Sequence, residues 1–277
     1  MNIGTRGSKL AKIQTDIAVK KLGIKGDVKI IKTHGDSSRK ELKSMGGRAF
    51  TRELDEALLR REIDIAVHSL KDIPVEGFPE ELEIACVVER GDPRDCLVSN
   101  RGDLTELPED AVVGASSERR KAEILRLRGG LKIKPLRGNV LTRMEKLDRG
   151  EYDAIITAKC ALDRLGISER ANRVFRISEM LPAAGQGAIA VVKRKDVEFD
   201  VPDELKPNLT PCMLERLFIT DLGACRKPVG AYCSSTKKGV YALVGLYYSG
   251  GLRLAPEFKG SPEEIKQAVQ AWKKKIL

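Results

Sequence analysis

The sequence has few aromatic residues, few histidines and no long apolar run. Aromatic side chains make up 4% of its 277 residues, and there are only two histidines. No stretch approaches the roughly 20 consecutive apolar residues that a helix needs to cross a bilayer, so we expect no membrane-spanning segment. Lys12, Gln14 and Asp16 interrupt the apolar positions near the N-terminus, which therefore lacks the pattern of a signal peptide. We expect a cytoplasmic protein.

The cysteines show neither a disulfide nor a metal-binding pattern. There is no C-x-x-C pair, and two histidines are too few to complete an ordinary zinc site. We therefore expect no metal, and most of the thiols should be small buried hydrophobic groups in a reducing compartment. The six are Cys86, Cys96, Cys160, Cys212, Cys225 and Cys233.

The net charge of +10 indicates an acidic partner. Nucleic acid is the usual first hypothesis, but acidic and basic residues are interleaved along the chain and aromatic residues for stacking on bases are scarce. The nucleotide-binding motifs G-x-x-x-x-G-K-[ST] and G-x-G-x-x-G are also absent. Small ligands with several negative charges are the better candidates.

Alternating strand and helix patterns predict α/β domains with mostly parallel sheets. The charged segment ERGDPRD at 89–95 interrupts the first series, and the alternation then restarts. The small side chains of LPAAGQGAIA at 181–190 argue against an ordinary core strand and favour a close backbone approach or a hinge that returns the chain to the first domain. We expect a discontinuous first domain (1–90 plus 186–207), a second domain (91–185) and a third (208–277).

The third domain should be small and α+β. Its sequence predicts one helix, then three strand-like runs at 229–235, 240–248 and 252–260, and a last helix. Ser261, Pro262 and Glu264 have the spacing of a capping box with proline at the first helical position. The last helix should therefore begin at this point.

Charged and hydroxyl residues follow several of the predicted strands, where helix N-termini and strand ends form anion sites in α/β folds. Arginine matches the planar carboxylate, so these positions favour a ligand with many carboxylates, although each arginine taken singly could lie on a solvated helix face. Asp72, an acid directly after an apolar strand, suits stabilisation of a developing cation, with a structural ion pair as the alternative. His68, inside that strand, should be a hydrogen-bonded core residue.

Taken together, these segments resemble the porphobilinogen deaminase family over nearly the whole chain. The matching segments are IGTRGSKLA, DIAVHSLKDIP, ERGDPRDCLVS, VGASSERR, LRGNVLTR, GEYDAIITA, LPAAGQGA and GACRKPVG, in family order. The resemblance implies two periplasmic-binding-protein-like α/β domains of type II around a cleft, plus a small C-terminal α+β domain. It also implies a transferase of haem and tetrapyrrole biosynthesis that condenses four porphobilinogens head to tail, with release of ammonia, to hydroxymethylbilane.

The resemblance further implies a dipyrromethane cofactor attached by a thioether to Cys225, and a monomeric enzyme. Asp72 would be catalytic, contacting pyrrole N–H groups and stabilising the cation left when ammonia departs, while Phe50 would stack on a ring. Gln186 belongs to the matching G-Q-G segment. The residues expected to hold the carboxylates are Arg6, Ser8, Lys71, Ser117, Arg119, Arg120, Arg137, Arg143 and Arg164.

Two other functions stay open on the residues alone. A solute-binding protein could share the two-domain fold and the arginines without any chemistry. A basic nucleic-acid binder would show binding that weakens steeply with salt. The absent export signal, the position of Asp72 and the setting of Cys225 favour the enzyme.

Overall fold

The computed structural model describes the chain except for residues 33–50, 225–226, 237–238 and 250–251. Phe50 and Cys225 therefore lie outside the described residues. The chain forms two compact units, residues 1–91 with 186–210, and residues 92–185 with 211–277. Each unit is compact but is formed from two separate stretches of the sequence. The predicted limits of three domains stay a prediction.

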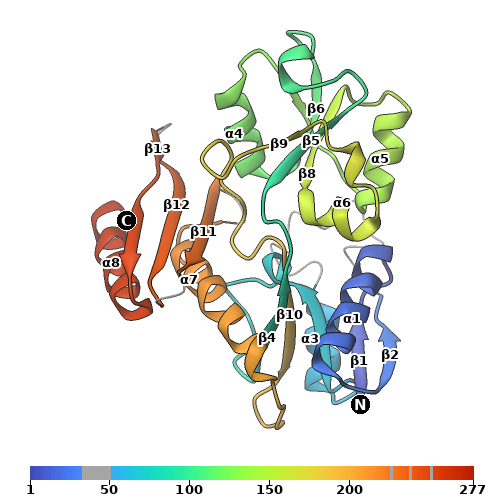
Figure 1. The fold of residues 1–277 in the computed structure, drawn as a ribbon, viewed down its shortest axis with the longest axis vertical. Helices are drawn as coiled ribbons and strands as arrows, with labels where there is room; N and C mark the ends of the chain where they lie inside the picture. Colours follow the sequence, from blue (N-terminus) through green and yellow to red (C-terminus); the bar gives the residue numbers. More distant parts are fainter. Residues whose placement is uncertain (33–50, 225–226, 237–238, 250–251) are drawn as a thin grey trace. The chain divides into compact units, whose positions relative to one another are not determined.

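The first unit is built on a mixed sheet with the strand order β2-β1-β3-β10-β4 (Figure 1). β1 is parallel to β2 and β3, whereas β10 is antiparallel to β3 and β4. β10 is buried along its whole length, so the expectation that 181–190 would not form a core strand is wrong for residues 188–190. Their small side chains suit an interior position between two neighbouring strands. The strands are β1 (Asn2–Thr5), β2 (Asp27–Ile30), β3 (Ile65–Ser69), β4 (Leu82–Arg90) and β10 (Ala188–Arg194).

Two α-helices accompany this sheet in the described residues, α1 (Lys9–Leu22) and α3 (Arg52–Leu59). The Ser8 hydroxyl oxygen accepts a hydrogen bond from the Ala11 N–H at 3.2 Å and so caps the start of α1. Gly23 ends the helix with φ of 63°, a left-handed conformation that glycine adopts without strain. The short helix η6 (Asp203–Asn208) closes the unit.

The second unit contains another mixed sheet, with the order β7-β6-β8-β5-β9. β6 lies between two parallel neighbours, as β1 does in the first sheet, and β5, the strand after β8 in the order, runs antiparallel to β8. The two sheets share the same pattern of parallel and antiparallel neighbours, which confirms the prediction of two α/β domains. The expectation of mostly parallel sheets is wrong, because β10 and β5 each run antiparallel to both of their neighbours. The strands are β5 (Asp95–Ser99), β6 (Val112–Gly114), β7 (Lys132–Lys134), β8 (Ala154–Ala158) and β9 (Arg173–Val174).

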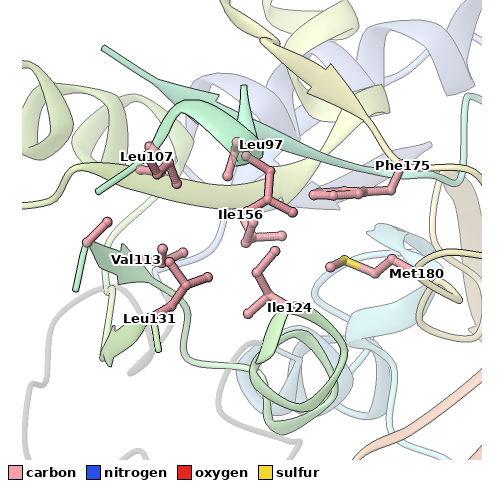
Figure 2. Packing of buried hydrophobic residues seen from close by; sticks show 11 residues of the cluster. Leu97, Leu107, Val113, Ile124, Leu131, Ile156, Phe175 and Met180 are labelled. Atoms are coloured by element: carbon pink, nitrogen blue, oxygen red, sulfur yellow. The ribbon is translucent and has the colours of Figure 1, made fainter. Parts of the chain in front are cut away.

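Helices cover both faces of this second sheet, because residues along each strand point alternately to opposite faces. α4 (Glu118–Leu127) places Ile124 against Leu97 and Ile156 in one apolar cluster, which Figure 2 shows with Phe175 and Met180. α5 (Val140–Asp148) packs its apolar side chains into a second cluster that includes the alternate strand residues. α6 (Lys159–Leu165) follows β8 directly, and the short helices η4 (Leu104–Glu106) and η5 (Ser168–Arg170) complete this part.

The C-terminal part of the second unit is an antiparallel sheet with two helices. The predicted capping box is confirmed, since the Ser261 hydroxyl and the Glu264 carboxylate cap the start of α8 reciprocally, with Pro262 in the first turn. The expectation of a single strand at 252–260 is wrong. Two strands form there, β13 before Pro256 and β14 after it, and they pair with different parts of β12. Proline has no N–H for the ladder, so the strand divides there. The elements are α7 (Leu209–Ile219), β11 (Val229–Ser235), β12 (Tyr241–Ser249), β13 (Leu252–Leu254), β14 (Glu257–Gly260) and α8 (Pro262–Ile276).

Candidate functional site

The strand order of the first unit brings four predicted site residues to one edge of its sheet. Arg6 follows the parallel strand β1, and Lys71 and Asp72 lie in the turn η3 (Leu70–Asp72) that follows β3. Gln186 precedes β10, which runs antiparallel to β3, so its start lies at the same edge. The carboxyl ends of parallel strands are where α/β folds bind ligands.

Two contacts fix this edge. The Lys71 ammonium donates a hydrogen bond of 3.3 Å to Gln186 Oε1, and Gln186 is fully buried. Ser69, the last residue of β3, exchanges hydrogen bonds with Gln14 of α1, the shorter at 2.9 Å. The turn that carries Asp72 is therefore held on one side by α1 and on the other by the start of β10.

His68 lies in β3 close to this edge and is 5% exposed. Burial, and secondarily the Arg6 guanidinium, lower its pKa to about 4, so the imidazole is neutral at physiological pH. The prediction of a hydrogen-bonded core histidine is confirmed for its burial but wrong for its Nε2 atom, which has no hydrogen-bond partner among the described residues. A neutral imidazole cannot act there as a cationic group for carboxylates.

In the second unit, the segment VGASSERR ends in an S-S-x-R-R motif at 116–120, and the two arginines of this motif enclose a buried carboxylate. Arg119 Nη1 and Arg120 Nη2 each lie 2.7 Å from a different oxygen of Asp95, and all three side chains are largely or fully buried. Arg119 also donates to the Leu181 carbonyl at 2.6 Å. Ser117 occupies the N-cap position of this helix, although its side chain makes no capping bond.

Asp95 is a residue that the sequence reasoning missed. Burial alone would raise the pKa of Asp95, but the charges of Arg119 and Arg120 and their hydrogen bonds outweigh it and hold the pKa well below its usual range. Two guanidinium groups and one carboxylate leave the cluster with a net positive charge. An acid at the start of an apolar strand, in a chain that also contains a pair of adjacent arginines, was the available signal.

The remaining predicted arginines of this unit are more accessible. Arg137 is exposed, while Arg143 and Arg164 are half-buried. Arg143 follows the N-cap residue Asn139 of α5, and its Nε donates to the Gly138 carbonyl at 2.8 Å. Arg164 lies in the last turn of α6, so the helix dipole of α6 does not favour an anion at that position.

Cys225 belongs to the segment 223–227, whose two end residues, Gly223 and Lys227, are described. Asp221 and Gly223 both adopt left-handed conformations, with φ of 63° and 68°. The Lys227 N–H donates to the Gly223 carbonyl at 2.9 Å, and its ammonium donates to the Tyr247 hydroxyl at 3.3 Å. The two ends of the segment are thus close together and anchored to β12.

Lys273 of α8 caps the helix that leads into this segment. Its ammonium, which is 10% exposed, donates to the Leu217 and Thr220 carbonyls at 2.8 and 2.5 Å. These carbonyls lie at the C-terminus of α7, where cations are favoured by the helix dipole. The ammonium also lies 3.9 Å from an oxygen of Asp221.

The five described cysteines are all buried, as the composition predicted. Burial raises the pKa of Cys86 to about 11 and that of Cys96 to about 12, which disfavours the reactive thiolate. Among the described residues no group of acidic, cysteine and histidine side chains could hold a metal ion. No helix in the described part of the chain is long and apolar enough to cross a membrane.

A family model described as porphobilinogen deaminase, dipyromethane cofactor binding domain, matches residues 1–200. The chain belongs to the porphobilinogen deaminase family. A probable porphobilinogen deaminase of Methanopyrus kandleri is 38% identical over 294 residues, covering 100% of this chain and 98% of that protein. The porphobilinogen deaminase of Thermus thermophilus is 41% identical over 283 residues, covering 96% of this chain and 91% of that protein.

The match of the porphobilinogen deaminase model takes in both α/β sheets and all the predicted site residues except Cys225. Solved structures with a similar fold include an ancestral arginine-binding protein, at 17% identity and a TM-score of 0.41, covering 71% of this chain and 84% of that chain. A ligand-binding component of an import system from Staphylococcus aureus has 12% identity and a TM-score of 0.41, covering 78% and 71%.

Proposed function

We propose that this chain carries out the reaction of its family on a dipyrromethane held by a thioether to Cys225. The reaction condenses four porphobilinogens head to tail, and water supplies the hydroxyl group when the four-ring product leaves as hydroxymethylbilane. In each addition the bond between the aminomethyl carbon and nitrogen breaks and ammonia leaves. A bond then forms between that carbon and the free α-carbon of the terminal pyrrole, which loses a proton. When bound, the dipyrromethane supplies the pyrrole carbon that accepts the first substrate.

The residues present fit such a group. The five described thiols are buried, and Cys225, the cysteine of the segment GACRKPVG that resembles the family's attachment site, is the candidate nucleophile. Each pyrrole carries an acetate and a propionate, and arginine forks match carboxylates in shape and charge. The candidate partners for these carboxylates stay those named from the sequence. They are Arg6, Ser8, Lys71, Ser117, Arg119, Arg120, Arg137, Arg143 and Arg164, with Gln186 holding Lys71 and Phe50 expected to stack on a ring.

Within this proposal Arg119 and Arg120 bind through the positive charge that remains after they neutralise Asp95. Their positions are fixed by that carboxylate before any ligand arrives, so no rotamer freedom is lost on binding. Arg6 and Arg137, by contrast, are half-buried and exposed and can adjust to successive rings. The two kinds of arginine would thus serve different steps of recognition.

Asp72 is the proposed catalytic residue. It is half-buried, and among the described residues it forms no ion pair, so the alternative of a structural pair with Lys71 gains no support. An ionised carboxylate beside the reacting carbon stabilises the cation that forms as ammonia departs. The fixed turn η3 holds the group in place for that step.

Replacing Asp72 tests the assignment. Asp72→Ala should retain the fold and lower kcat about a hundredfold or more with little change in KM, since the interaction forms mainly in the transition state. The measurement is the rate of ammonia release at a series of porphobilinogen concentrations. Glu76→Gln, an exposed acid in the next loop, is the matched control and should keep the wild-type rate. A near-normal rate for Asp72→Ala would remove Asp72 from the mechanism.

A monomeric state and a cytoplasmic location are part of the same proposal, on the grounds of the family resemblance and the sequence pattern. Light scattering on the purified protein should give one chain per particle. If the purified chain binds porphobilinogen but releases no ammonia, the solute-binding alternative is favoured instead.

A further inference from the structure

Glu123 of α4 is a fully buried carboxylate that joins two parts of the second unit. Tyr248 of β12 donates its hydroxyl to Glu123 Oε1 at 2.6 Å. Arg253 of β13 donates through Nε at 3.0 Å and through Nη2 at 3.3 Å. Arg126, on the same helix as Glu123, adds a bond of 3.3 Å. The C-terminal sheet is therefore hydrogen-bonded to the helix that begins with the S-S-x-R-R motif.

The carboxylate of Glu123 lies beside the guanidinium groups of Arg126 and Arg253. Burial alone would raise the pKa of Glu123, but the hydrogen bonds from Arg253 and Tyr248 outweigh it, so the pKa lies below the ordinary value. Burial, and then the bond to Glu123, raise the pKa of Tyr248 to about 12, which keeps its hydroxyl proton in place as the donor. Glu123 therefore stays ionised and Tyr248 stays protonated throughout the physiological pH range.

Close backbone contacts lie beside the cluster. A Cβ at Gly230 would come within 2.9 Å of Arg119 Cδ and 2.6 Å of the Pro182 carbonyl oxygen, so only glycine fits there. The next residue, Ala231, donates its N–H to the same carbonyl at 3.2 Å. Strand β11 is thus in contact with Arg119.

A second buried carboxylate ties the same parts together. Glu215 of α7 accepts hydrogen bonds of 2.7 Å from the Gly185 and Cys233 N–H groups. One donor lies in the segment that ends the second α/β domain, and the other lies in β11. Each buried carboxylate requires its donors, so separating these parts would leave unpaired charge.

We propose that Glu123 is a positioning residue that keeps the C-terminal sheet at a fixed place against Arg119 while rings are added. The inference rests on the proposed function, because it gives Arg119 a carboxylate to bind and the C-terminal part a cofactor to hold. The consequence is that α4 and strands β11 to β13 act as one body through all the additions. The bonds of Glu123 do not open during the cycle.

The inference is tested by removing the contact between Glu123 and Tyr248 and then replacing it with a chemical cross-link. The double variant Glu123→Cys with Tyr248→Cys abolishes the contact, and a short bis-maleimide then restores a link between the same two positions. The described native cysteines are buried, and peptide masses show which thiols are joined. Glu118→Gln, on the exposed part of the same helix, is the matched control.

Two measurements are made on each protein, the rate of ammonia release and the hydrogen exchange of the Ala231 amide. Without the bridge, ammonia release should fall about tenfold and exchange should rise about tenfold, as expected for the loss of a buried charged contact. With the bridge, both should return to within about twofold of the wild type. The control should match the wild type in both.

If the unbridged double variant releases ammonia and exchanges the Ala231 amide at wild-type rates, the inference is overturned, because the contact would then not hold the C-terminal sheet in place. A fully bridged protein that stays slow would also overturn it, because the joint would then have to open. A wild type that releases no ammonia contradicts the proposed function instead, and the exchange of Ala231 still decides whether Glu123 holds the sheet in place.

Discussion

At the scale of single residues, the chain relies on buried carboxylates that accept hydrogen bonds from arginines or from backbone N–H groups. Asp95, Glu123 and Glu215 are each fully buried, and each joins segments far apart in the sequence. Such groups contribute little net stability as pairs, but removing one partner leaves an uncompensated buried group. They therefore act mainly by fixing where the functional side chains lie.

Asp95→Asn should destabilise the protein by about 3–5 kcal/mol, because two buried guanidinium groups lose their counter-charge. Urea unfolding at neutral pH measures the loss. Asp110→Asn, which breaks an exposed pair with Lys132, is the control and should leave the unfolding midpoint unchanged. Equal stabilities for the two variants would contradict the structural role of Asp95.

The same carboxylate predicts a pH dependence. The pKa of Asp95 is lower in the folded state than in the unfolded state, so the unfolded chain binds more protons in acid. Its contribution is fully present above the unfolded pKa of about 3.9 and is lost as the pH falls toward the folded pKa. Wild-type stability should therefore fall more steeply below about pH 4 than that of Asp95→Asn.

At the scale of elements, the end of α7 depends on a side chain from α8. Lys273→Met keeps the aliphatic stem but removes the ammonium from two helix carbonyls, and should cost about 1–2 kcal/mol in the free energy of unfolding. Lys274→Met, on the exposed face of the same turn, should cost nothing measurable. Thermal unfolding of the two variants compares them, and equal midpoints would contradict the cap.

The sequence predicted elements well where local signals determine them. The capping box of Ser261 and Glu264 is local, and so is the alternation of apolar runs that predicted both α/β sheets. The prediction from sequence failed for residues 188–190, because the side chains there do not reveal that β3 and β4 pair with this segment on either side. It also missed the division at Pro256, because one long strand and two short ones have the same apolar pattern.

The site shows the same limit. The sequence placed Arg6, Lys71 and Asp72 at strand ends, and the strand order brings them to one edge of the first sheet. It did not reveal that Arg119 and Arg120 share Asp95, or that Glu123 meets Arg253 from 130 positions away. Such partners are set by the folded topology, and no local spacing encodes them.

At the scale of the whole molecule, the chain is a porphobilinogen deaminase for which we propose that arginine and carboxylate clusters hold a polymer growing on one thiol. The two α/β sheets supply strand ends for charged side chains, and in the C-terminal part the Lys227 N–H donates to the Gly223 carbonyl. Family membership establishes the reaction. The attachment of the primer to Cys225 is the claim on which the remaining assignments depend.

The intact mass of the purified protein tests that claim most directly. The wild type should exceed the mass of its sequence by two condensed pyrroles, and Cys160→Ala, which alters a buried thiol, should carry the same excess. Cys225→Ser should have only the mass of its sequence and no turnover. An active wild type with an unmodified mass, or a Cys225→Ser protein that keeps the excess, would contradict the account.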